Sequence, residues 1–328
     1  MNIGLMILAG IVALFLPFEL FLFSYVILGP LHYLTELSWL HKRQYFFPGK
    51  RDYFVLALLS LVILSPAFLR VYYNLSGQTD LSSNALYIHV KEAGRVMVFV
   101  SFAVAAVLVF VRNGYMRAIA IALAFIIGFV FREHLFITIL FALFVPTLIH
   151  VFIFTGAFIL VGALKGRSVS GILSLIVFIS CSVALFLIHR HPVNNSGTNI
   201  TSAYDAGFSR VNAQLFAVFL HQHPSRNDLY YSHIGILVMR FIAFAYTYHY
   251  LNWFSKTSVI KWHQVPKRSL ALVLILWILS VLLYFTSYIT GLAVLYFLSM
   301  LHVIFEFPLN FQTFKEIGKL SIAMVRRK

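Results

Sequence analysis

Apolar runs about as long as a bilayer is thick dominate this sequence. Nine of them occupy residues 4–30, 53–73, 95–112, 117–131, 135–164, 170–188, 232–254, 269–287 and 289–307. A helix needs about 20 apolar residues to cross the hydrocarbon core of a membrane. A mean hydropathy of +0.90 is too high for one soluble core, so the expected solvent is lipid. The sequence predicts an all-α polytopic transmembrane helix bundle of about nine spans, built as a single integral membrane domain over residues 1–328.

Basic residues are distributed unevenly among the loops between these runs. Most of the 25 lysines and arginines fall in 42–51, 112–117, 165–167, 256–268 and 315–328. Lysine and arginine accumulate in cytoplasmic loops of membrane proteins. This pattern predicts that the N-terminus lies outside and the C-terminus in the cytoplasm, with an odd number of spans. The net charge of +15 then reflects loops that face anionic lipid rather than nucleic acid. The expected location is the cell membrane.

The longest segment between two runs is 189–231. Its first half is polar and rich in turn-forming residues, whereas Phe208, Val211, Leu215 and Val218 in its second half have helical spacing. We expect an amphipathic helix there, lying in the outer membrane interface. Several histidines fall on this outer side, among them His189, His191, His221, His223 and His233. Solvated loop residues are the simpler interpretation of this set, and a second metal site is the alternative.

Three spans carry a histidine near their predicted cytoplasmic ends. His32, His249 and His302 are expected at one membrane depth. Glu36 follows His32 by four residues, and Glu306 follows His302 by four. On a helix this spacing places imidazole and carboxylate on one face, one turn apart. For any one of these histidines alone, a hydrogen-bonding role at a helix end is the simpler interpretation, but the trio with two paired acids predicts a metal site.

The types of side chain present narrow the choice of metal. Imidazole with some carboxylate suits Fe(II), zinc or copper, whereas hard cations prefer oxygen ligands. The lone Cys181 leaves no thiolate set for an iron–sulfur cluster or structural zinc. We therefore expect Fe(II), with zinc possible. A carboxylate can bind the metal or orient a ligating imidazole, and Asn252, three residues after His249, is placed to do the same.

Four short motifs follow one another along the chain: Gly29-Pro30-Leu31-His32 with Glu36, Leu148-Ile149-His150, Thr247-Tyr248-His249, and His302 with Glu306. In these motifs the chain resembles the Brp/Blh family of membrane-embedded bacterial beta-carotene 15,15'-dioxygenases. The chain departs from the family in having Glu36 where the family has aspartate, and fewer histidines after His249. The resemblance implies a helix bundle in a bacterial inner membrane, in which His32, His150, His249 and His302 hold a non-haem iron.

Of these four histidines, His150 is the one whose sequence position does not place it at the depth of the others. In a straight helix it would lie about 20 Å from the inner boundary, at 1.5 Å per residue. It can meet the other histidines only if the long fifth span is shifted, or kinked at Pro146.

The leading hypothesis is a membrane metalloenzyme, a non-haem Fe(II) oxygenase or dioxygenase that acts on a lipid-soluble, isoprenoid or carotenoid-like substrate. Glu36, Glu306 and Asn252 would support catalysis or serve as alternate ligands. The alternative is a transporter or permease whose intramembrane histidines and glutamates form a proton or substrate path. A third interpretation is a structural membrane protein with incidental histidines. The sequence names neither the substrate nor the oligomeric state.

Overall fold

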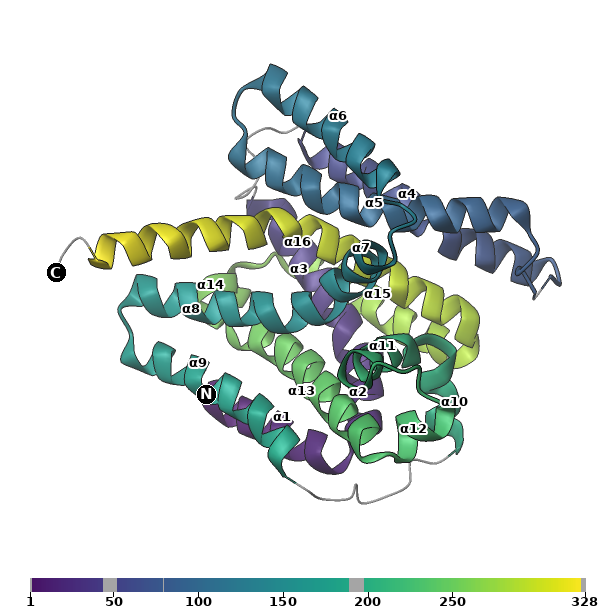
Figure 1. Cartoon of the computed structure of the whole chain (residues 1–328). Coiled ribbons are helices and arrows are strands. Elements are labelled where there is room, and N and C mark those ends of the chain that lie inside the picture. The colour runs from purple at the N-terminus through teal and green to yellow at the C-terminus, as the bar shows by residue number, and fades with distance from the viewer. Residues whose placement is uncertain (1, 44–51, 79, 189–197, 326–328) are drawn as a thin grey trace. The chain divides into compact units, whose positions relative to one another are not determined.

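A computed structural model describes residues 2–43, 52–78, 80–188 and 198–325 (Figure 1). Within these ranges the regular structure is helical, and no strand occurs. Eight helices are long and apolar enough to cross a membrane, and the apolar helices Asn2–Phe15 and Gly114–Val130 are shorter. The predicted all-α polytopic bundle is confirmed, and the chain is a multi-pass membrane protein.

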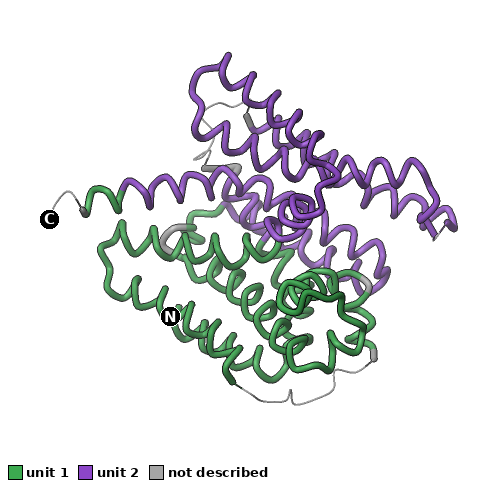
Figure 2. Tube along the Cα trace, in the orientation of Figure 1, with its two compact units in different colours: residues 1–32, 147–265, 320–328 green, residues 33–146, 266–319 purple. Residues whose placement is uncertain are grey.

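The chain divides into two compact units, which are described separately (Figure 2). Unit 1 comprises residues 1–32, 147–265 and 320–328, and unit 2 comprises residues 33–146 and 266–319. Three helices contribute residues to both units: α3 (Gly29–Arg43), the π-helix η2 (Leu140–Phe154) and α16 (Tyr288–Val325). A single domain over the whole chain stays a prediction.

Unit 1 is built around one buried helix, α13. The other helices that lie wholly in this unit are α1 (Asn2–Phe15), α2 (Pro17–Phe23), η1 (Ser24–Leu28), α8 (Thr155–Gly166), α9 (Val169–Leu187), α10 (Thr198–Gly207), α11 (Ser209–Leu220), α12 (Arg226–Tyr231), α14 (Thr257–Ile260) and η3 (Trp262–Gln264). Helix α13 (His233–Ser255) contacts α1, α2, α9, α11 and α12. Most of its residues from Gly235 to Tyr250 are buried, as expected for a helix that is apolar on every side.

The first predicted span, 4–30, is wrong, because the chain is broken at Leu16. Helix α1 ends at Phe15, and α2 begins at Pro17. Proline has no N–H to continue a preceding helix, but it is well suited to the first position of a new one.

The break reverses the direction of the chain. Along α13, the Arg240 guanidinium contacts the Leu14 carbonyl, and Phe244, one turn later, lies beside Gly10. Helix α1 is therefore antiparallel to α13. After the break, Ser24 hydrogen-bonds to Thr247 at 2.7 Å, and the His32 ring lies 5.6 Å from Trp253, measured between centroids. The segment from α2 into α3 therefore runs parallel to α13, and the N-terminus lies at the same end of unit 1 as Ser255.

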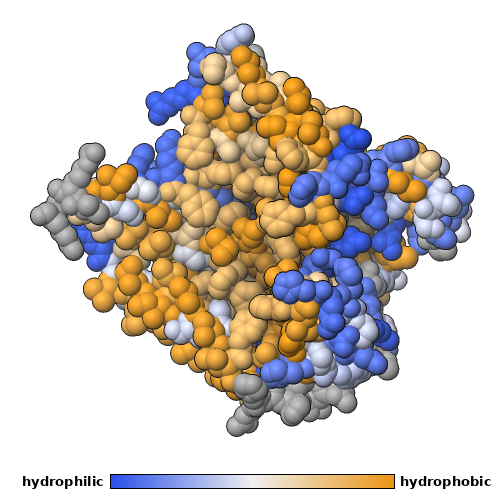
Figure 3. Space-filling view, viewed as in Figure 1, coloured by the Kyte–Doolittle hydropathy of each residue, from blue (hydrophilic) through white to orange (hydrophobic). Residues whose placement is uncertain are grey.

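Unit 1 presents two kinds of surface. Apolar side chains of α1 and α9, such as Leu8, Ile11 and Ile176, are about half exposed. Figure 3 shows this apolar face, and hydrophilic residues gather over α10 to α12. The apolar face suits contact with lipid.

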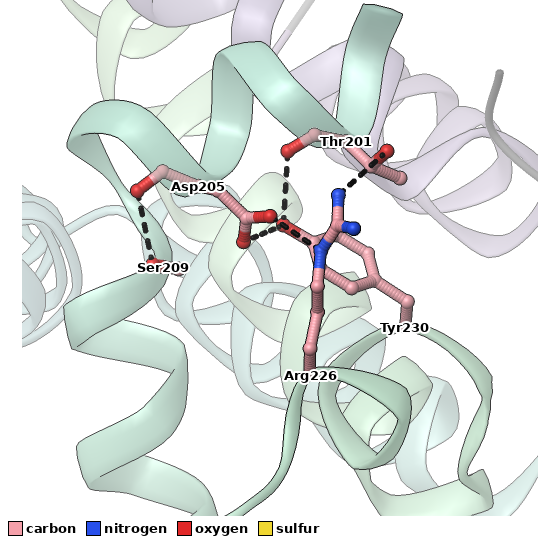
Figure 4. Close-up of polar contacts among 5 residues, drawn as sticks. All are labelled: Thr201, Asp205, Ser209, Arg226 and Tyr230. Carbon is pink, nitrogen blue, oxygen red and sulfur yellow. Dashed lines mark hydrogen bonds and ion pairs between the residues drawn. The ribbon is translucent and has the colours of Figure 1, made fainter. Parts of the chain in front are cut away.

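The segment between α9 and α13 contains the predicted amphipathic helix. It is α11, which buries Asn212 and Phe216. The expectation of a polar turn region was wrong for residues 198–202, which belong to α10 (Thr198–Gly207). The Asp205 carboxylate connects α10 to α12, because it pairs with Arg226 at 2.7 Å and accepts a hydrogen bond from the Tyr230 hydroxyl at 2.5 Å (Figure 4).

The helices that lie wholly in unit 2 are α4 (Asp52–Leu75), α5 (Ala85–Phe110), α6 (Gly114–Val130), α7 (Leu135–Ile139) and α15 (Lys267–Thr286). Helix α5 contacts α4 and α6, and its Phe102 ring lies 5.1 Å from the Phe307 ring of α16. The predicted ninth span, 289–307, was too short, since α16 continues to Val325 through Pro308. A proline removes one backbone donor, and neighbouring packing can keep the helix intact beyond it.

Candidate metal centre

Unit 1 brings together three of the four predicted metal ligands. His32 comes from the first turn of α3, His150 from η2 and His249 from α13. Their exposed fractions are 1%, 1% and 5%. The Nε2 atoms of His32 and His249 lie 3.1 Å apart, and the His150 and His249 ring centroids are separated by 4.9 Å. These segments are remote in sequence, so tertiary packing creates the cluster.

The position of His150 depends on an unusual helix. Residues Leu140–Phe154 form a π-helix with Pro146 inside it. π-Helices bond residue i to i+5 and occur mostly as short segments, frequently at functional sites. His150 therefore lies on a segment that departs from a straight α-helix, and its ring approaches that of His249. Thr155, five residues after His150, also lies near the imidazole of His249.

His249 has a second polar contact that the sequence did not predict. Its Nδ1 atom lies 2.8 Å from the Thr155 hydroxyl oxygen, and Thr155 is 1% exposed. Thr155 is the first residue of α8. The two ring nitrogens of His249 therefore face Thr155 on one side and His32 on the other.

The separation of the two Nε2 atoms fits a shared metal ion. Imidazole nitrogens bind such ions at about 2.0–2.1 Å. Two nitrogens 3.1 Å apart can both reach one ion at that length if the angle between the bonds is about 95–102°. A hydrogen bond between the imidazoles would give a similar distance, so the spacing permits either state.

Unit 2 contains a second buried polar group. The carboxyl groups of Glu36 in α3 and Glu306 in α16 hydrogen-bond to each other. The ring of His302, one turn before Glu306, stacks on Tyr33 with 4.2 Å between centroids. Glu36, His302 and Glu306 are each at most 2% exposed. Two carboxyl groups placed this way can share a proton between them.

Helix α3 contributes His32 to the group in unit 1 and Glu36 to the group in unit 2. It is continuous from Gly29 to Arg43, and His32 and Glu36 lie one turn apart on it. The buried histidine and carboxylate groups that could hold a metal ion include His32, His150, His249, His302 and Glu306.

The polar face of α16 continues past the glutamate. His302, Glu306, Asn310 and Thr313 recur at spacings of four, four and three residues, and all are buried. This spacing follows one side of a helix. Sequence reasoning missed Asn310 and Thr313, although the spacing itself was visible.

Asn252 and the outer histidines remain apart from these contacts. Asn252 is buried, and its Oδ1 accepts a long hydrogen bond of 3.5 Å from the Tyr248 hydroxyl. His221, His223 and His233 are exposed, in agreement with the interpretation as solvated residues. His189 and His191 lie outside the described residues.

Comparison with protein-family models, with curated proteins and with solved structures finds no match to this chain. The fold and the buried groups define its class: a multi-pass helical membrane protein with histidine and glutamate side chains that could bind a metal. The resemblance to the Brp/Blh family stays a prediction.

Proposed function

We propose that the chain is an integral membrane metalloenzyme in which His32, His150 and His249 of unit 1 bind one Fe(II) ion. The observation that carries the proposal is the 3.1 Å separation of the Nε2 atoms of His32 and His249, both buried among apolar helices. Polar side chains at membrane depth are costly and are retained mainly for function. Two imidazoles from separate helices with facing nitrogens are typical of neighbouring metal ligands.

The donor set supports iron. Imidazole nitrogens with carboxylates nearby suit Fe(II) oxygenase sites, and zinc is the next candidate. When bound with open coordination positions, Fe(II) supplies O₂ chemistry.

The buried acids have roles that follow from their contacts. Glu36 and Glu306 would share a proton, which one of them could donate and the other accept. Helix α3 places Glu36 one turn from His32, where a carboxylate can orient an imidazole. Asn252 lies one turn after His249 and adds a neutral amide to the same part of α13.

The proposed substrate is a lipid-soluble isoprenoid or carotenoid-like molecule, cleaved or hydroxylated within the bilayer. Two features support this class: the histidines lie among apolar helices, and lipid-suited side chains cover α1 and α9. The four motifs similar to those of the Brp/Blh family favour the same class.

Metal analysis of the purified protein tests the proposal. The wild type, purified without oxygen and loaded with Fe(II), should retain close to one equivalent per chain, and His32→Gln and His249→Gln should lose most of it. His263→Gln is the matched control, because His263 is an exposed histidine of unit 1. A wild type that retains no metal after loading, or a His249→Gln variant that retains all of it, would refute the proposal.

A second candidate function is proton-coupled transport. The hydrogen-bonded pair of Glu36 and Glu306 favours it, because buried carboxyls that share a proton are typical of proton relays. Proton flux into proteoliposomes measures this directly. Flux by metal-free wild type that disappears in Glu306→Gln would support transport, and metal retention without flux would favour the enzyme.

A further inference from the structure

Thr155 is the one polar side chain described in contact with Nδ1 of His249. Its hydroxyl oxygen lies 2.8 Å from that nitrogen, and both side chains are buried. A neutral imidazole carries one N–H, and the contact on one nitrogen decides which nitrogen keeps a free lone pair. A hydroxyl can donate or accept, so the contact admits two arrangements of hydrogen atoms.

We infer that Thr155 is a positioning residue that accepts a hydrogen bond from Nδ1–H of His249. The unprotonated Nε2 of His249 then faces His32, whose own Nε2–H donates to it across 3.1 Å in the metal-free protein. The importance of this arrangement for the metal rests on the proposed function. When a metal binds, only His32 has to give up its Nε2 hydrogen.

The helix that carries Thr155 explains why it is suited to this role. The π-helix η2 ends at Phe154, and Thr155 begins α8. Threonine is stiff at χ1, so the backbone at this junction sets the direction of the hydroxyl. Burial at 1% excludes water as a competing acceptor for the Nδ1 hydrogen. His150 and Thr155 thus support His249 from one segment of chain, His150 through its ring and Thr155 through a hydrogen bond.

Three substitutions separate positioning from a loss of packing. Thr155→Val keeps the shape and removes the hydroxyl, and Thr155→Ser keeps the hydroxyl. Thr247→Val is the matched control, because it removes a buried hydroxyl that bonds to Ser24 at 2.7 Å in the same unit. Loss of a hydrogen bond that orients a metal-binding histidine typically weakens metal affinity by about 10–100-fold. We expect that loss in Thr155→Val, near-normal affinity in Thr155→Ser, and wild-type affinity in Thr247→Val.

The tautomer of His249 gives a readout that needs no metal. Full-length protein labelled with ¹⁵N-histidine, metal-free and in lipid, is measured by NMR, and the His249 signals are assigned by their loss in His249→Gln. The wild type should show a protonated Nδ1 and an unprotonated Nε2, and Thr155→Val should show a mixture of tautomers. A protonated Nε2 in the wild type, or an unchanged tautomer and affinity in Thr155→Val, overturns the inference. A wild type that binds no Fe(II) but shows the expected tautomer refutes the metalloenzyme and leaves the positioning role in place.

Discussion

Arg240 is expected to contribute strongly to the stability of unit 1. It is 1% exposed, its Nε donates to the Leu14 carbonyl at 3.0 Å, and one terminal nitrogen donates to the Ile188 carbonyl at 3.2 Å. Leu14 lies in the last turn of α1, and Ile188 is the C-terminal cap of α9. The last carbonyls of a helix have no donor within the helix, and a cation is favourable there.

The magnitude follows from these two bonds. A hydrogen bond to a charged group contributes about 1.5–3 kcal/mol, so the pair contributes about 3–6 kcal/mol. Arg240→Met leaves both carbonyls without this donor, which is destabilising. It also removes the free-energy cost of burying a charge, which offsets part of that loss. We expect a net loss of about 2–4 kcal/mol. The loss of stability in Arg240→Lys should lie between zero and the loss in Arg240→Met. An ammonium group keeps the charge but cannot match the two-pronged geometry of guanidinium.

Thermal unfolding in mild detergent, combined with hydrogen exchange, measures this effect. Exchange should accelerate at the ends of α1 and α9 before other helices of unit 1. Arg210→Met is the control, because Arg210 is an exposed arginine in the same unit. Arg240 does not stabilise the ends of α1 and α9 if Arg240→Met unfolds at the same temperature as Arg210→Met. The same conclusion follows if hydrogen exchange at these two helix ends is as slow in Arg240→Met as in the wild type.

Three further predictions concern unit 1. A tag at the N-terminus and a protease site placed after Ser255 should be accessible from the same side of the membrane, since α1 is antiparallel to α13; access from opposite sides would support the N-terminus-outside prediction instead. Gly235→Ala should cost about 1–3 kcal/mol in the unfolding free energy, because its Cβ would lie 2.2 Å from the Asp228 carbonyl oxygen; Gly4→Ala, with open space around it, is the control. Hydrogen bonds from the Ser225 side chain and backbone hold the pKa of Asp228 below its usual value, so the support that Asp228 gives to α12 should be complete above about pH 4 and be lost as the pH falls through that lower pKa. Hydrogen exchange of α12 should show this loss in the wild type, and the same pH dependence in Asp228→Asn would contradict it.

Much of the helical architecture could be predicted from local features. The spans 53–73, 170–188, 232–254 and 269–287 agree with observed helices to within a few residues. Lipid requires each spanning segment to satisfy its own backbone hydrogen bonds, so apolar length alone predicts a helix there. The same rule failed at residues 4–30. Hydropathy does not show that the chain reverses its direction when the helices before and after the turn are both apolar. Pro17 was the visible signal of that break.

The sequence by itself determined that this chain is a helical membrane protein with histidines and acids at membrane depth. Spacing along single helices was enough to pair His32 with Glu36, and His302 with Glu306. Tertiary structure alone decided that His150 and Thr155 both approach His249, and that Arg240 caps two helices. These contacts are between segments that lie far apart in the chain. The π-helix η2 and the reversal between α1 and α2 bring these segments together. Neither feature alters the apolar periodicity from which helices are predicted, so no pattern along the sequence could indicate which polar groups would meet.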